Sequence, residues 1–234
     1  MVDMDNPALS DVVALLSRSC DFGTEVERCV ALHDFVRDTI AFGFTPDFER
    51  VTPERTLRLG IGHCNAQADL FRALLGEAGI QACLRFVELD KQVLRHAVPD
   101  IVFHLLPARL FHAVTRVRVN GTWLNTDSYI FQPEQYACQI LRLERHGLSK
   151  GYGLTQDAVC DWDAVTDAFS QASGDALAED NPVYSCLADT IRDKAGNNRC
   201  FGLHFNQLLG FVPIRLRDPV QRYLNKRLHT RACR

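Results

Sequence analysis

The chain has 234 residues, of which 47% are hydrophobic and 24% charged, and its formal net charge is −3. These values are typical of a globular protein with a sizeable core, and they exclude a disordered chain and a fibrous repeat. No apolar run reaches the roughly 20 residues that a membrane helix needs, and the acidic N-terminus lacks the features of a secretion signal. We therefore expect a cytoplasmic protein without a membrane or nucleic-acid partner.

Nine cysteines are scattered along the chain, without a C-x-x-C pair or the spacing of a zinc finger. An odd, irregular set without an export signal predicts reduced thiols rather than a disulfide framework. The nearest metal-like arrangement is His104 with His112, which is too sparse for a site, so we expect no metal. Four cysteines without a chemical context are interpreted as small buried hydrophobic residues: Cys138, Cys160, Cys186 and Cys200.

Two helices are predicted before residue 60. Residues 24–40 begin with a capping box, Thr24 and Glu27, and continue with apolar residues at helical spacing. After a loop, Thr52 and Pro53 have the residue types of an N-cap and a first helical position. The threonine side chains can accept a hydrogen bond from a free N–H group of the first turn, and the proline has no N–H group to satisfy. These residues therefore mark helix starts.

The segment GIGHCNAQADLFRALLGEAGI places a cysteine at the start of a third helix, expected from Cys64 to Ala78 with Gly79 as its C-terminal cap. Free N–H groups and the macrodipole at a helix N-terminus favour a thiolate, so Cys64 is a candidate nucleophile. A buried structural thiol is the alternative. The preceding His63 is a weaker candidate for substrate binding, because a partly exposed loop histidine explains it more simply.

A strand is predicted over residues 80–89, where apolar and polar side chains alternate after a glycine. Residues 90–111 have no clean period and contain two prolines, so we interpret them as an insertion or lid that packs over Cys64. The segment HAVTRVRV, the dipeptide Asn120–Gly121 and the segment TWLNTD then predict a hairpin with a type I′ turn. Helices followed by antiparallel strands indicate an α+β fold.

The register of this hairpin brings two polar side chains together. A two-residue loop at Asn120–Gly121 pairs Val119 with Thr122, which places His112 and Asp127 on one face as diagonal neighbours. An imidazole and a carboxylate can form a hydrogen bond at that separation, and a nucleophilic cysteine needs an oriented base. The alternative is that Asp127 starts a turn and His112 is a half-buried strand residue. A slip by one residue would separate the two side chains.

These segments resemble the transglutaminase-like superfamily. GHCNAQADLFRALLGEAGIQA is similar to its nucleophile motif, FHAVTRVRVNGTWLNTD to its paired motif, and ALHDFVRDTIAF to the helix before the nucleophile. The resemblance implies a papain-like core over residues 1–130, with the nucleophile helix packed on a small antiparallel sheet. It also implies that Cys64 is the nucleophile, His112 the base and acid, and Asp127 the orienting carboxylate of a stand-alone, bacterial-type member.

Such a site implies acyl transfer from an amide or thioester, through a thioacyl intermediate on Cys64 that water or an amine releases. Two alternatives stay open: lyase or cyclase chemistry on a small metabolite, and a binding protein that keeps the fold without turnover. We expect no cofactor and a small-molecule or carrier-bound substrate. No upstream residue matches an oxyanion donor of the family.

Residues 131–234 are expected to form a mostly helical and irregular extension packed on the core. In it, residues 170–182 are interpreted as a mobile loop, and Asp161 or Asp163 as a helix cap. Trp123, in the preceding hairpin, is expected in the core.

The last 20 residues carry seven Lys or Arg against one Asp. They predict either a solvated helix or a dock for an anionic partner. The helix would turn four apolar residues inward: Val220, Tyr223, Leu224 and Leu228.

Overall fold

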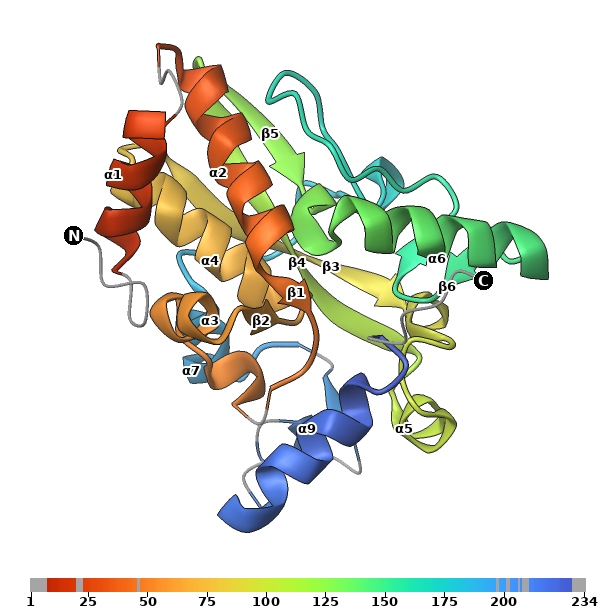
Figure 1. Ribbon diagram of the computed structural model, residues 1–234. Coiled ribbons are helices and arrows are strands. Elements are labelled where there is room, and N and C mark those ends of the chain that lie inside the picture. Colours follow the sequence, from red (N-terminus) through yellow and green to blue (C-terminus); the bar gives the residue numbers. More distant parts are fainter. Residues whose placement is uncertain are drawn as a thin grey trace.

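The computed structural model of the protein has an α+β fold, in which helices pack on a four-stranded antiparallel sheet (Figure 1). The predicted fold class is confirmed. The strands run in the order β5-β4-β3-β8. They span Ala82–Asp90 (β3), Arg109–Val119 (β4), Thr122–Thr126 (β5) and Val183–Tyr184 (β8). The structure describes residues 8–19, 23–45, 47–196, 198–200, 203–205, 207 and 211–228.

The first 80 residues supply the helices that cover this sheet. Helix α4 packs directly on β3 and β4, and α1, α2 and α3 pack on α4. A short parallel pair, β1 and β2, holds the end of α2 beside the start of α4. The bounds are Leu9–Ser19 (α1), Glu25–Thr39 (α2), Ala41–Phe42 (β1), Pro53–Leu59 (α3), Ile61–Gly62 (β2) and Cys64–Glu77 (α4).

The core lies between α4 and the sheet, where Leu70, Leu74, Leu84 and Phe86 are almost fully buried. Removing such side chains from water is the main driving force for folding, at about 1.5–3 kcal/mol for each one. The burial therefore fixes how α4 lies on β3 and β4.

Both predicted helix starts are present. The Glu27 N–H donates to the Thr24 hydroxyl at 3.2 Å, and the Thr24 N–H donates to the Glu27 carboxylate at 2.8 Å, so the capping box of α2 is closed. In α3, the Thr52 hydroxyl accepts from the N–H of Arg55 at 3.3 Å, and Pro53 is the first helical residue. Local sequence thus determines where these helices begin.

The hairpin between β4 and β5 has the predicted register, with Val119 opposite Thr122 and the ladder continuing to Thr115 and Thr126. Asn120 and Gly121 have φ of 47° and 85°, as a type I′ turn requires. Asp127 lies just beyond the ladder. Its N–H donates to the Ala168 carbonyl at 3.1 Å, so the backbone near residue 168 provides the hydrogen-bond partner where β5 ends.

The connection between β3 and β4 is shorter than the insertion expected over 90–111. Strand β4 begins at Arg109, which pairs with Asp90, and the Phe111 ring stacks on Phe86 with a centroid distance of 4.2 Å. Residues 109–111 therefore extend the sheet, and only residues 91–108 form the connection. It contains a 3₁₀ turn over Lys91–Leu94 and the short helix α5 (Asp100–Leu105).

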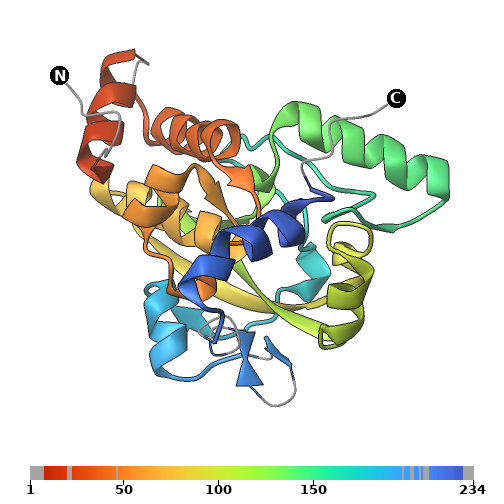
Figure 2. The same ribbon diagram turned by 60° about the horizontal axis from the view of Figure 1, so that its bottom comes forward.

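The part of the chain after residue 130 wraps around this core. It contributes β8 to the sheet and three described helices, with irregular segments and short strand pairs between them. Figure 2 shows α9, in dark blue, crossing the front of the core. The remaining bounds are Pro133–His146 (α6), Lys150–Gly151 (β6), Leu154–Thr155 (β7), Leu187–Arg192 (α7), Arg199–Cys200 (β9), Leu203–His204 (β10) and Arg217–Asn225 (α9).

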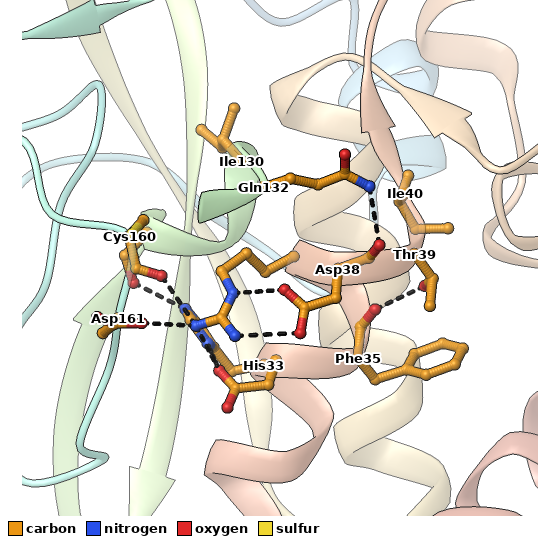
Figure 3. Close-up of polar contacts among 12 residues, drawn as sticks. His33, Phe35, Asp38, Thr39, Ile40, Ile130, Gln132, Cys160 and Asp161 are labelled. Carbon is orange, nitrogen blue, oxygen red and sulfur yellow. Dashed lines mark hydrogen bonds and ion pairs between the residues drawn. The ribbon is translucent and has the colours of Figure 1, made fainter. Parts of the chain in front are cut away.

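Arg37 fastens α2 to the chain near residue 160 (Figure 3). Its guanidinium donates to the Asp161 carboxylate at 2.7 Å and to the Cys160 carbonyl at 3.3 Å. The predicted helix cap at Asp161 or Asp163 is wrong, because Ala164 has φ of 54°, which an α-helix excludes. Asp163 instead accepts N–H groups of a tight turn.

Two aromatic residues expected inside are exposed. Trp123 is 38% exposed because it lies on the edge strand β5, where the Arg116 guanidinium covers its ring at 4.7 Å. Tyr223 is 49% exposed, whereas Leu224 is partly buried and Leu228 fully buried. The inward stripe of α9 follows a spacing of four residues, and Tyr223 lies one residue out of it.

The cysteines also differ in part from the expectation. Cys138 is disulfide-bonded, so the prediction of reduced thiols is wrong for it. Cys160 is buried, as expected of a small apolar residue, but Cys186 is only half-buried at the N-cap of α7. Five cysteines are free thiols: Cys29, Cys64, Cys83, Cys160 and Cys186. None of the helices among the described residues has the length and apolar character to span a bilayer.

Candidate active site

Cys64 is the first residue of α4, as its sequence context predicts. A tight approach leads to it: Gly60 has φ of 60°, and a Cβ on Gly62 would lie 3.0 Å from the side chain of Thr56. The first bond of the helical ladder runs from the Gln67 N–H to the His63 carbonyl. The N–H groups before Gln67 therefore point out of the helix start beside the sulfur, where they favour negative charge.

His112 and Asp127 form a buried pair, with 2.7 Å between Nε2 of the imidazole and Oδ2 of the carboxylate. Both side chains are excluded from solvent. The contact is the one that the hairpin register predicts, although Asp127 lies one residue past the ladder. It leaves Nδ1 as the ring nitrogen available for other contacts.

The Asp127 carboxylate is held by three consecutive backbone N–H groups. The N–H of Ser170 donates to Oδ1 at 2.6 Å, that of Ala172 to Oδ2 at 2.8 Å, and that of Gln171 to Oδ2 at 3.3 Å. These donors replace the water that a buried carboxylate loses. The interpretation of residues 170–182 as a mobile loop is wrong at its start, because these bonds fix the segment against the site.

Cys64 acts electrostatically on His112. Burial by itself would lower the pKa of His112, but the Coulombic interaction with Cys64 and the hydrogen bond to Asp127 outweigh burial and raise it to about 10. Nδ1 of the ring is buried and makes no hydrogen bond of ordinary geometry. The arrangement therefore favours a protonated imidazole beside the Asp127 carboxylate.

His63 is not the partly exposed loop histidine that the sequence suggests. It is 2% exposed and stacks on Phe48, with a centroid distance of 4.5 Å and an angle of 7° between the rings. Both ring nitrogens are buried without a hydrogen-bond partner. Burial, together with the charge of His112, lowers the pKa of His63 to about 3, so it is uncharged.

A buried amide network beside Cys64 was not predicted from the sequence. Asn65 accepts the N–H of Ala113 at 2.8 Å and donates to Glu49 at 3.0 Å. Asn198 donates to the same carboxylate at 2.8 Å and bonds both the N–H and the carbonyl of Phe111, at 2.9 and 3.0 Å. The network locks the start of α4 to the strand that carries His112. Asparagines have no local pattern that would have revealed it.

A cavity of about 290 Å³ opens beside Cys64 and His112. His63 lies in its wall, and most other contributors are aliphatic or aromatic. Several come from the 91–108 connection, such as Val93, Val98 and Val102. Within the described part of the chain, no group of three or more His, Cys, Asp or Glu is placed to hold a metal ion.

Comparison with known proteins agrees with this geometry. Residues 16–128 match the profile of the transglutaminase-like superfamily. This part of the chain is therefore similar to members of that superfamily. The match covers Cys64, His112 and Asp127, and it supports cysteine-based catalysis in general.

Similarity beyond the family profile is slight. The sequence matches none of the curated proteins. A solved structure of a proposed cysteine protease from Cytophaga hutchinsonii is 16% identical, with a TM-score of 0.36. The similarity covers 53% of this chain and 38% of that one. It therefore spans well under half the length of that structure.

Proposed function

We propose that the protein is a cysteine-dependent acyl-transfer enzyme that acts on an amide or thioester. The observation that carries the proposal is the buried pair of His112 and Asp127, in which Cys64 helps to raise the pKa of the imidazole. A purely structural histidine in such a place would need neither a thiolate nor three N–H groups behind its carboxylate. We assign Cys64 as nucleophile, His112 as acid and base, and Asp127 as orienting group.

In the first half-reaction the Cys64 thiolate attacks the substrate carbonyl, and a carbon–sulfur bond forms as the carbonyl becomes an oxyanion. The free N–H groups at the start of α4 are the donors closest to that charge. The oxyanion collapses, the bond to the leaving nitrogen or sulfur breaks, and His112 protonates the leaving group. General acid assistance of this kind contributes typically ~10²–10⁴-fold.

In the second half-reaction water or an amine attacks the thioacyl group on Cys64. His112, now neutral, accepts the proton of the attacking group, and the thiolate leaves. Asp127 keeps the imidazole in one orientation and stabilises its charged form throughout. Whether water or an amine is the acceptor divides a hydrolase from an acyltransferase, and both use the same residues.

Reaction of Cys64 itself tests this proposal. Iodoacetamide at neutral pH, followed by peptide mass spectrometry, should modify Cys64 faster than Cys83 or Cys186, which are also free and half-buried. His112→Ala should remove this preference while leaving the other two rates unchanged. Equal labelling of all three thiols in the native protein would contradict an activated nucleophile.

An anionic carrier at the basic C-terminal residues stays a prediction. Arg227 is engaged by Asp100 at 2.7 and 2.8 Å, whereas Arg215 and Arg222 are exposed. Charge reversal of the exposed pair, Arg215→Glu with Arg222→Glu, should raise KM for a carrier-bound donor and not for a small one. Added salt should have the same effect on the native protein, because screening shortens the range of charge to ~3 Å at 1 M.

A further inference from the structure

We propose that the acyl group transferred at Cys64 is an uncharged hydrocarbon chain of medium length, and that the cavity beside the sulfur holds it. This inference rests on the proposed acyl-transfer function. It concerns which substrate the site accepts, because a nucleophilic cysteine alone does not distinguish a polar acyl group from an apolar one.

The wall of the cavity comes from segments far apart in the sequence, and each contributes apolar side chains. Strand ends supply Leu89 and Leu110, the connection between them supplies Val98 and Val102, and α9 supplies Leu224. Such a surface gains free energy by contact with hydrocarbon, at about 25 cal/mol for each Å² of apolar area removed from water. The lining therefore favours an alkyl chain.

The side-chain amides of the wall already form hydrogen bonds within the protein. The amides of Asn65 and Asn198 bond to Glu49 and to the Phe111 backbone, and the Gln171 amide donates to the Gly153 carbonyl. His63 is uncharged.

Besides the uncharged His63 and His112, which is paired with Asp127, no basic side chain lines the cavity among the residues described. A carboxylate or ammonium group at the end of the acyl chain would lose its hydration among apolar side chains, and the charge of His112 is already paired with Asp127, so burying that group costs several kcal/mol.

The size of the cavity limits the chain. A water molecule occupies about 30 Å³ in the liquid, and a methylene group is of similar size, so 290 Å³ holds on the order of ten non-hydrogen atoms. That volume lies at the lower end of ligand sites, which start at ~300 Å³. It accommodates an acyl chain of roughly six to eight carbons more readily than a longer one.

Helix α9 sets this limit on one side, because two contacts hold the helix in place and its Leu224 lines the cavity. The Asn225 side chain bonds both the N–H and the carbonyl of Phe44, each at 2.8 Å. Arg227 forms its ion pair with Asp100 of α5 on the other side. Held at both rims, α9 forms one wall of the cavity.

A series of acyl donors tests the inference. N-acetylcysteamine thioesters of acetate, butyrate, hexanoate, octanoate, decanoate and dodecanoate differ only in chain length, and the adipyl thioester matches hexanoyl with a terminal carboxylate. We expect kcat/KM to rise by up to about fourfold per methylene as far as hexanoyl or octanoyl, and to fall for dodecanoyl. The adipyl donor should be at least tenfold worse than hexanoyl.

Two neighbouring residues of α5 provide a matched pair of variants. Val102 lines the cavity, whereas Ile101 is 64% exposed and does not. Val102→Trp should move the optimum to butyryl or shorter, and Ile101→Trp should leave the profile unchanged. Val102→Ala, which removes volume without strain, should move the optimum to longer chains and serves if the tryptophan variant does not fold.

The outcomes separate this inference from the proposed function. Acylation of Cys64 with a flat chain-length profile, or with adipyl equal to hexanoyl, would overturn the inference and leave acyl transfer intact. The proposed function would be overturned if mass spectrometry detected no acylation of Cys64 with any of the thioesters. Calorimetry of octanamide binding to Cys64→Ala then tests whether the cavity binds a hydrocarbon chain, independently of catalysis. Binding that is abolished by the additional substitution Val102→Trp would support the inference. Absence of binding would contradict it.

Discussion

The candidate site is built from two regions that are held in different ways. Residues 41–127 carry the three candidate catalytic side chains, with Cys64 at a helix start, His112 on a long strand and Asp127 directly after a strand. Residues 160–228 are largely irregular and supply none of those three. They nevertheless supply the N–H groups behind Asp127, the Asn198 amide beside His112 and the Asn225 clamp at the cavity rim.

This difference indicates that the first region carries the candidate catalytic side chains and that the second region holds them in position. In the first region, a helix start and a hairpin register determine which side chains meet, and both depend on residues close in sequence. In the second, single hydrogen bonds cross 43 to 181 positions of the chain. If this division of roles is correct, variants in the first region should lower the rate with a stable fold, and variants in the second should lower stability and rate together.

The largest effect is expected at Asp127, where the two regions meet. Asp127→Asn should lower kcat by ~10²–10⁴-fold, because the imidazole loses its orienting charge. It should also lower the free energy of unfolding by about 1–3 kcal/mol, because the amide nitrogen faces backbone donors and leaves one unsatisfied. Single-turnover kinetics and urea unfolding measure both. A native rate would show that Asp127 only supports the fold.

The pH dependence of the rate sharpens the role of the first region. Because the pKa of His112 is raised to about 10, the imidazolium should persist through neutral pH and be lost as pH rises through that value. We expect kcat to be flat between pH 7 and 9 and then to fall about tenfold per pH unit. Far-ultraviolet circular dichroism at each pH provides the control for unfolding. A fall already at pH 7 would contradict the charged pair.

Asn198 tests the second region without touching the reacting groups. Asn198→Ala removes its bonds to Glu49 and Phe111 and should cost about 2–3 kcal/mol of unfolding free energy. The rate should fall as well, because Phe111 precedes His112. Arg199→Ala, at the exposed next position, is the matched control and should change neither quantity. Loss of rate with native stability would place Asn198 in the chemistry instead.

The smallest effect concerns acid stability and His63. Its pKa is lowered to about 3 in the fold and is ~6.5 when unfolded, so the unfolded state binds a proton first and stability falls as pH drops below 6.5. His63→Phe keeps the aromatic stack and removes this proton. When the pH falls from 7 to 5, the free energy of unfolding of the variant should decrease by up to about 2 kcal/mol less than that of the native protein. Equal losses in urea unfolding would show that His63 does not titrate in this way.

Sequence reasoning succeeded wherever a short pattern fixes a backbone geometry. The Thr24 and Thr52 caps, the Asn120–Gly121 turn and the helix start at Cys64 all have local causes, and the structure contains each of them. The pairing of His112 with Asp127 followed from strand alternation alone. These features depend on steric and hydrogen-bonding rules that act over a few residues.

It failed where burial or a distant partner decides. His63 is buried by the stack with Phe48, and Trp123 is exposed because no element covers that part of β5. Asp161 meets Arg37 from 124 positions away, which no helix-cap rule takes into account. In each case the residue type is compatible with either environment, and the packing of distant segments around it determines which one occurs.

The sequence by itself thus determined the α+β class, the helix that begins at Cys64 and the register that joins His112 to Asp127, since local geometry specifies them. Only the tertiary structure decided that Ser170–Ala172 hold the carboxylate, that amides lock Cys64 to β4, and that α9 lines an apolar cavity. The physical reason is that these contacts join segments whose residues are unremarkable until the chain folds. Their free energy is gained only when water is excluded from both partners at once.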